Sequence, residues 1–260
     1  MFIAQCGTHS QCGMYLARLS TATDPKVMLI FKSPPGDSLL FHYSGHGSRQ
    51  RNYNGDEVDG YDETLCPLDF ETQGMIVDDE LNATIVRPLP TGVKLHAIVD
   101  ACHSGTVLDL PFLCRMHRTG QYGWEDHRPR SGVWKGTSGG EVVSFSGCDD
   151  NQTSADTSAL SKITSTGAMT FCFIQAIERG HYNTYGSILN SMRAAIRGAR
   201  DDVGGGAVTS LLTMLLTGGS ASGGFRQVLK HGLTVFQQFL ELVPSPNKSH
   251  VFFSGVEPTT

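Results

Sequence analysis

Short apolar runs without a helical period recur along the chain. They lie at 38–46 (SLLFHYSGH), 93–100 (VKLHAIVD) and 141–147 (EVVSFSG), with a fourth candidate at 207–216. Runs of this length that end at glycine or polar residues are typical of buried strands, and strands buried on both faces belong to parallel sheets. We therefore predict four strands of a mostly parallel sheet.

Two segments between the third and fourth runs carry apolar residues at helical spacing. The first, Ala168 to Arg179, stops at Gly180, and the second, Tyr185 to Arg200, begins after Thr184 as its N-cap. Threonine is a favoured N-cap and glycine a common helix stop. Strands that alternate with helices indicate an α/β fold.

Three polar segments have no apolar period, and we expect them to be loops. They cover 47–62, which is acidic and rich in Asn and Gly, 103–140, and 204–224, which has glycines at both ends. Long loops inside a compact domain are usually functional or cleaved.

The composition and charge of the chain argue against certain classes of binding partner. A net charge of −5 and a pI near 6.0 leave no basic excess for phosphate contacts, so we expect no nucleic-acid partner. The longest apolar run, 207–216, is far shorter than the roughly 20 residues that span a bilayer. The first twenty residues make a poor signal peptide. We expect a cytoplasmic monomer with reduced thiols.

Reactive residues follow two consecutive predicted strands, His46 after the first and Cys102 after the second. In open parallel sheets, ligands bind beyond the carboxyl ends of the strands. An imidazole that takes the thiol proton turns a cysteine into a nucleophile. Taken singly, His46 is more simply a polar loop residue and Cys102 a packing residue, but together they favour a Cys/His pair.

The strings around this pair are Y-S-G-H-G at 43–47 and D-A-C-H-S-G at 100–105. Caspase-type enzymes place a histidine about 50 residues before a cysteine in an A-C-x-G-like turn, and here Cys102 follows His46 by 56 residues. Over about 36–224 the chain resembles the plant type I metacaspases.

The resemblance implies an α/β, caspase-like (caspase-hemoglobinase) fold with a mostly parallel sheet flanked by helices. A large-subunit-like part would cover about 36–160 and a small-subunit-like part about 165–224. Residues 1–35 lack the early strand of the family and 225–260 lack its closing strand, so we expect divergent ends and an incomplete sheet.

The resemblance also implies roles for the site residues. Cys102 would attack the scissile carbonyl, His46 would protonate the leaving amine, and the backbone N–H groups of Gly47 and Cys102 would form the oxyanion hole. Adjacent residues at a strand end tend to point apart, so His103 is a poorer base than His46.

Asp100 suggests the specificity. The chain reads D-A-C where the caspase signature reads Q-A-C. A carboxylate beside the nucleophile attracts a cationic P1 side chain and repels an acidic one, which favours cleavage after Arg or Lys. The alternative for Asp100 is a loop cap. The resemblance adds Ser44 as a second S1 pocket residue.

Four acids are candidate metal ligands: Asp62, Asp78, Asp79 and Asp109. Their spacing alone indicates solvated charges, with Asp79 as a helix N-cap, and forms no EF-hand loop. The resemblance implies instead that they bind an activating Ca²⁺.

Basic residues in the predicted loops are candidate self-cleavage sites for an enzyme that cuts after Arg or Lys. The alternative is a solvated basic face. The candidates are Arg115, Arg118, Arg128, Arg130, Lys135 and Lys162.

The expected function is therefore that of a Ca²⁺-dependent cysteine endopeptidase that acts on protein substrates and takes part in programmed cell death. The competing hypothesis is a weak or inactive metacaspase-like chain that acts by binding, for example to full-length metacaspases. A zinc hydrolase is disfavoured, because the histidines lack ligand spacing.

Overall fold

Two compact units make up the chain. One contains residues 1–157 and 245–260, and the other contains 158–244. The computed structural model describes residues 2–6, 13–16, 33–116, 121–146, 168–180, 184–201 and 250–254. The predicted strand at 207–216 lies outside the described residues, and the domain limits at 35 and 224 stay predictions.

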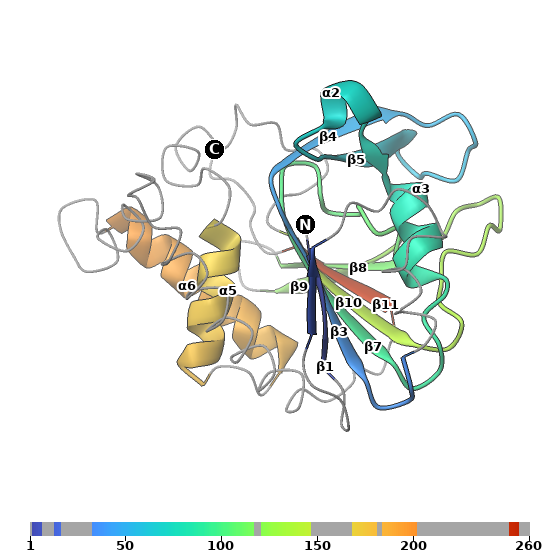
Figure 1. The fold of residues 1–260 in the computed structure, drawn as a ribbon. Helices are drawn as coiled ribbons and strands as arrows, with labels where there is room; N and C mark the ends of the chain where they lie inside the picture. Colours follow the sequence, from blue (N-terminus) through green and yellow to red (C-terminus); the bar gives the residue numbers. More distant parts are fainter. Residues whose placement is uncertain are drawn as a thin grey trace. The chain divides into compact units, whose positions relative to one another are not determined.

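The first unit is built on an eight-stranded sheet in the order β2-β1-β3-β7-β10-β11-β8-β9 (Figure 1). The strands from β3 to β8 in this order run parallel, and the outer strands β1, β2 and β9 are antiparallel to their neighbours. Three predicted strands are confirmed, and the sheet has the mostly parallel order of the caspase-like fold that the sequence predicts. The bounds are β1 (Phe2–Cys6), β2 (Gly13–Leu16), β3 (Ser38–Ser44), β7 (Lys94–Asp100), β8 (Phe112–Met116), β9 (Tyr122–Asp126), β10 (Glu141–Ser146) and β11 (His250–Ser254).

Both ends of the chain add strands to this sheet. β1 pairs with β3, and β11 lies between β10 and β8. Strands from both ends thus join the sheet, β1 antiparallel to β3 and β11 parallel to β10 and β8, although the sequence pattern predicts no strand at either place. The sequences FIAQC and HVFFS hold aromatic and branched residues suited to strands, but they are short and match no family motif.

A second, three-stranded sheet has the order β4-β5-β6 and consists of β4 (His46–Arg51), β5 (Tyr61–Cys66) and β6 (Ile76–Val77). The predicted loop at 47–62 is thus largely an antiparallel hairpin, and the predicted loop at 103–140 contains β8 and β9. The β4 side chains are polar and partly exposed, and pairs such as Arg49 over the Tyr61 ring, at 4.4 Å, replace apolar burial. Such a hairpin leaves no apolar period in the sequence.

Short helices join this second sheet to the main core. They are α2 (Phe70–Gln73), α3 (Asp78–Leu81) and the π-helical turn η1 (Asn82–Val86). Leu81, Ile85 and Val86 are buried in one cluster with side chains of β3 and β7, including Phe41 and Leu95. This packing attaches α3 and η1 to the central strands β3 and β7.

The second unit contains the helices α5 (Ala168–Glu178) and α6 (Tyr185–Asp201), as predicted. Thr184 caps α6, because its Oγ1 accepts the N–H of Ser187 at 3.0 Å. Gly180, with φ of 78°, follows the end of α5. Among the described residues, no helix is long and apolar enough to span a membrane.

Candidate active site and acidic cluster

The parallel pairing of β3 with β7 brings the two reactive segments to one edge of the sheet. Ser44 is opposite Asp100, and the N–H of Gly45 donates to the Asp100 carbonyl at 3.2 Å. His46 and Cys102 each follow this last pair by two residues. The structure therefore places them as the strand pattern predicts.

A close backbone contact joins the two segments. A Cβ atom at Gly47 would lie 2.0 Å from the carbonyl oxygen of Cys102 and 3.3 Å from the Cβ of Ala101. Only glycine leaves room for that carbonyl, so the sequence G-H-G at the start of β4 has a steric reason. The two predicted oxyanion donors therefore belong to backbone segments in direct contact.

Tyr43 was missed by the sequence reasoning, and it anchors the histidine segment. Its hydroxyl lies 2.8 Å from the His46 carbonyl oxygen and 2.9 Å from that of Cys66, so its proton is donated to this pair of carbonyls. Burial, reinforced by the Cys66 thiol, raises the pKa of Tyr43 to about 12, which keeps the donor protonated. The ring covers Gly45, whose Cβ would meet the Tyr43 hydroxyl at 2.7 Å.

The hydroxyl of Ser104 holds the turn after β7 in place. This buried hydroxyl lies 2.8 Å from the carbonyl oxygen of Ala101 and 2.7 Å from the hydroxyl of Ser146 on β10. His103 adopts φ of 52°, a left-handed conformation that costs energy for a residue with a side chain. Cys102 is half-buried at this turn and forms no disulfide within the described part of the chain, while His46 is exposed.

Asp100 and Ser44 are half-buried neighbours in register at the ends of β7 and β3. The structure thus brings together the two residues expected in the S1 pocket, directly before the turn that holds Cys102. Their role in specificity stays a prediction.

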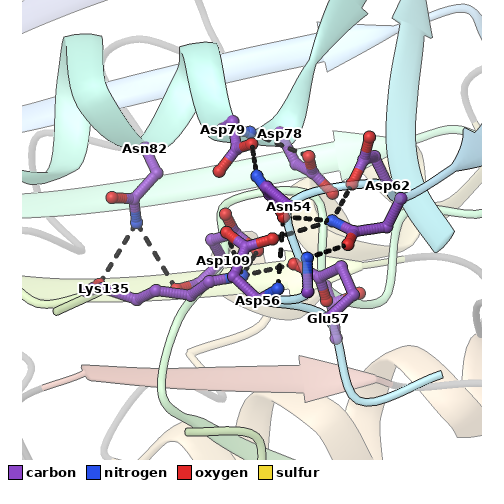
Figure 2. Close-up of polar contacts among 12 residues, drawn as sticks. Asn54, Asp56, Glu57, Asp62, Asp78, Asp79, Asn82, Asp109 and Lys135 are labelled. Carbon is purple, nitrogen blue, oxygen red and sulfur yellow. Dashed lines mark hydrogen bonds and ion pairs between the residues drawn. The ribbon is translucent and has the colours of Figure 1, made fainter. Parts of the chain in front are cut away.

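The four predicted metal ligands also meet, in an acidic cluster that two further acids join (Figure 2). Asp62 comes from β5, Asp78 and Asp79 from the first turn of α3, and Asp109 from the segment after Cys102. We use the name acidic cluster for these four with Asp56 and Glu57. Three sets of its carboxylate oxygens lie within 4.8 Å of one another: Asp56, Asp79 and Asp109; Glu57, Asp78 and Asp109; and Asp62, Asp78 and Asp79.

Hydrogen bonds hold these carboxylates in place. Asp78 accepts the N–H of Glu63 at 2.6 Å and that of Asp79 at 2.8 Å, which ties α3 to β5. Asn52 donates to Asp56 at 2.7 Å, and Asn54 donates to Asp79 at 2.9 Å. The alternative reading of Asp79 as an N-cap is wrong, because α3 begins at Asp78 and its N-cap residue is Val77.

Burial and the crowding of like charges raise the pKa of three carboxyl groups in the cluster. Burial, with repulsion from Asp109, raises the pKa of Asp78 to about 9 and that of Glu57 to about 10. Burial, with repulsion from Asp56 and then Asp109, raises the pKa of Asp79 to about 6. Asp109 has φ of 54° and is buried, and its Oδ2 has no hydrogen-bond partner among the residues that the structure describes. An unpartnered buried carboxylate oxygen among other carboxylates fits a hard cation such as Ca²⁺.

Comparison with known proteins settles the family. A family model for the metacaspase peptidase C14 domain matches residues 22–111, the range that holds His46 and Cys102. Together with an identity of 79% to an Arabidopsis thaliana metacaspase over 78% of this chain, the match shows that the chain belongs to the metacaspase family.

Its relatives include two metacaspases of Arabidopsis thaliana. Metacaspase-1 is 79% identical over 207 residues, which cover 78% of this chain and 56% of that protein. Metacaspase-2 is 64% identical over 201 residues, which cover 74% of this chain and 48% of that protein. The metacaspase chain thus spans about half the length of these curated relatives. Among solved structures, protein GSU0716 from Geobacter sulfurreducens matches with 22% identity over 64% of either chain. Its TM-score of 0.38 is too low for the similarity to support a conclusion.

The candidate self-cleavage residues of this metacaspase fall into different environments. Arg128 and Arg130 are exposed in the segment after β9. Arg115 lies within β8 and pairs with Glu125 at 2.8 Å. Arg118 and Lys162 lie outside the described residues.

Lys135 departs from the expectation of an exposed basic loop residue, because it is 5% exposed and binds the acidic cluster. The sequence gives no signal for this, since its partners are 26 to 79 residues earlier in the chain. Asp56 and Glu57 were missed for the same reason, although the acidic stretch N-G-D-E was visible.

Proposed function

We propose that this chain is a cysteine endopeptidase that cleaves after Arg or Lys, with Cys102 as the nucleophile and His46 as its acid–base partner. The contact of Gly47 with the Cys102 carbonyl is the observation that carries the proposal. It brings the backbone beside His46 against the nucleophile turn, at the edge of a parallel sheet where ligands bind. The family supports the same reaction class.

The reaction follows from these residues. His46 takes the proton of the Cys102 thiol, and the thiolate attacks the scissile carbonyl carbon. The N–H groups of Gly47 and Cys102 stabilise the oxyanion, and His46 then gives its proton to the leaving amine, which breaks the C–N bond. Water hydrolyses the thioester, releases the new carboxylate and returns the proton to the thiol.

Asp100 supplies the specificity in this proposal. Its carboxylate at the end of β7, opposite Ser44, attracts the cationic head of a P1 Arg or Lys. Self-cleavage then takes place at an accessible basic residue, and exposed Arg128 and Arg130 are the best placed of the described candidates. Protein substrates, a role in programmed cell death and action as a cytoplasmic monomer belong to the same proposal.

We also infer that the acidic cluster binds Ca²⁺ through Asp62, Asp78, Asp79 and Asp109. The short distances among their oxygens and the unpartnered Oδ2 of Asp109 support this. When bound, the ion supplies positive charge that offsets carboxylate repulsion. Because Asp109 follows the nucleophile by seven residues, ordering this carboxylate also orders the segment that leaves Cys102.

The test is turnover of peptides with Arg, Lys or Asp at P1 by the purified chain, with Ca²⁺ and with a chelator. Cys102→Ala should abolish cleavage, whereas Cys172→Ala, at a cysteine of α5, should retain it. Asp100→Asn should lower kcat/KM on Arg and Lys peptides by about tenfold or more, because a cationic P1 loses its charged partner. Equal loss on a neutral P1 peptide would indicate misfolding instead.

A folded chain that turns over none of these peptides would contradict the proposal. That result would favour the alternative function, binding without catalysis, and full-length metacaspases would be the first partners to assay.

A further inference from the structure

A lysine already occupies the acidic cluster as a cation. The Lys135 ammonium lies 2.8 Å from Oδ1 of Asp109 and 3.5 Å from Oδ2 of Asp56, and it also bonds Glu57 (Figure 2). Its side chain is 4% exposed, so this is a buried ion pair network rather than a surface contact. Charges buried in this way interact much more strongly than exposed ones.

The backbone at Lys135 and just after it is held independently of the Lys135 ammonium. The Asn82 amide donates to the carbonyls of Lys135, at 3.1 Å, and of Leu108, at 2.9 Å. Ser138 donates to the Arg87 carbonyl at 2.7 Å. The side chain of Lys135 can therefore leave the cluster while its main chain stays attached to η1.

The ammonium and a metal ion would use the same oxygens. Asp109 belongs to two of the three sets of clustered carboxylates, and each of these sets contains a second partner of Lys135, either Asp56 or Glu57. Ca²⁺ takes six to eight oxygen ligands, and it repels a neighbouring ammonium. Only the set of Asp62, Asp78 and Asp79 leaves Lys135 untouched. The unpartnered Oδ2 of Asp109 favours a site that includes Asp109.

We propose that Lys135 is an internal cation that competes with a divalent metal ion for the acidic cluster, so that metal binding expels its ammonium to solvent. This rests on the proposed Ca²⁺ site and assigns it a built-in competitor. The competition weakens Ca²⁺ binding and so sets the concentration at which the metal acts. Without metal, Lys135 supplies the positive charge that holds the segment after Cys102 next to α3.

Two measurements on the whole chain test this. In the first, a lysine-acylating reagent is applied with and without Ca²⁺, and modification is read by mass spectrometry. Lys135 should become several-fold more reactive with Ca²⁺, whereas Lys94, half-buried at the start of β7, should not change. Unchanged protection of Lys135 at saturating Ca²⁺ would overturn the proposal.

The second measurement is Ca²⁺ affinity by calorimetry for Lys135→Met and for the matched, charge-keeping variant Lys135→Arg. Loss of the competing charge should tighten binding by about tenfold or more, and Lys135→Arg should remain close to the unmodified chain. Equal affinities in all three proteins would contradict the competition.

The outcomes separate the two proposals. If neither the unmodified chain nor Lys135→Met binds Ca²⁺, the proposed metal site fails. If both bind equally and Lys135 stays protected, the metal site stands at Asp62, Asp78 and Asp79 and the competitor role fails. Should Lys135→Met not fold, the acylation measurement on the unmodified chain still decides.

Discussion

Replacing Gly47 by alanine should separate the geometry of the active site from the stability of the fold. The added methyl would lie 2.0 Å from the Cys102 carbonyl oxygen, whereas ordinary contacts lie near 3.5 Å. The neighbouring atom is backbone, so β4 and the nucleophile turn must move apart by about 1 Å or more. Overpacking of this kind costs about 1–3 kcal/mol of unfolding free energy. A misplacement of about 1 Å at reacting groups costs about a hundredfold in rate.

The assay pairs urea denaturation with kcat/KM on an Arg peptide, and Gly74→Ala is the control. Gly74 has φ of 82° and open space around it, so alanine there pays a backbone cost of about 1–3 kcal/mol without touching the site. Both variants should lose stability, but only Gly47→Ala should lose about a hundredfold in kcat/KM. Wild-type kcat/KM in Gly47→Ala would refute the argument, because the contact with Cys102 would then not exist in the active protein.

Two further predictions concern buried polar groups. Tyr43→Phe should lower the unfolding free energy by about 1–2 kcal/mol, because the carbonyls of His46 and Cys66 lose their donor. It should also reduce kcat more than it raises KM. An unchanged kcat would show that Tyr43 does not position His46. Burial, with repulsion from Lys94, lowers the pKa of His96 to about 3, and burial lowers the pKa of His42 to about 4. Both histidines therefore stay neutral in the folded chain, whereas in the unfolded chain each binds a proton below about pH 6.5. Stability should therefore fall by at most about 1.4 kcal/mol per pH unit for each histidine as the pH drops from 6.5 toward their folded pKa values. Unfolding curves of His96→Gln between pH 4 and 7 should show a shallower slope, and an unchanged slope would exclude His96 as a source.

The placement of His46 and Cys102 beside each other could be predicted because its information is local in sequence. His46 and Cys102 each follow an apolar run that is typical of a buried strand. The parallel pairing of those two strands then brings both residues to the same end of the sheet. Gly47 was predicted as an oxyanion donor, but its steric role depends on a carbonyl from another segment. Tyr43 is part of the Y-S-G-H-G motif, but its role could not be predicted, because its two acceptors come within reach only when β4 and β5 fold back over it.

The sequence pattern failed to predict those parts of the structure in which polar groups pair across long separations in the chain. The hairpin of β4 and β5 has no apolar period, since its pairing depends on backbone hydrogen bonds and contacts such as Arg49 on Tyr61. Lys135 looked like a basic loop residue, because nothing in spacing shows that Asp56 and Asp109 will surround it. β1 and β11 were missed because five-residue strands without a motif resemble many other segments.

The position of β11 has a consequence for the order in which the sheet is made. His250–Ser254 lies between β10 and β8, so the hairpin of β8 and β9 reaches the parallel sheet only through a strand synthesised more than a hundred residues after it. On the ribosome, residues 112–126 emerge long before their neighbour exists and must wait with an open edge. Pairing over such separations makes folding slow and exposes that edge to wrong partners. Chaperone capture of nascent chains that end before residue 250 should therefore exceed capture of chains that include it.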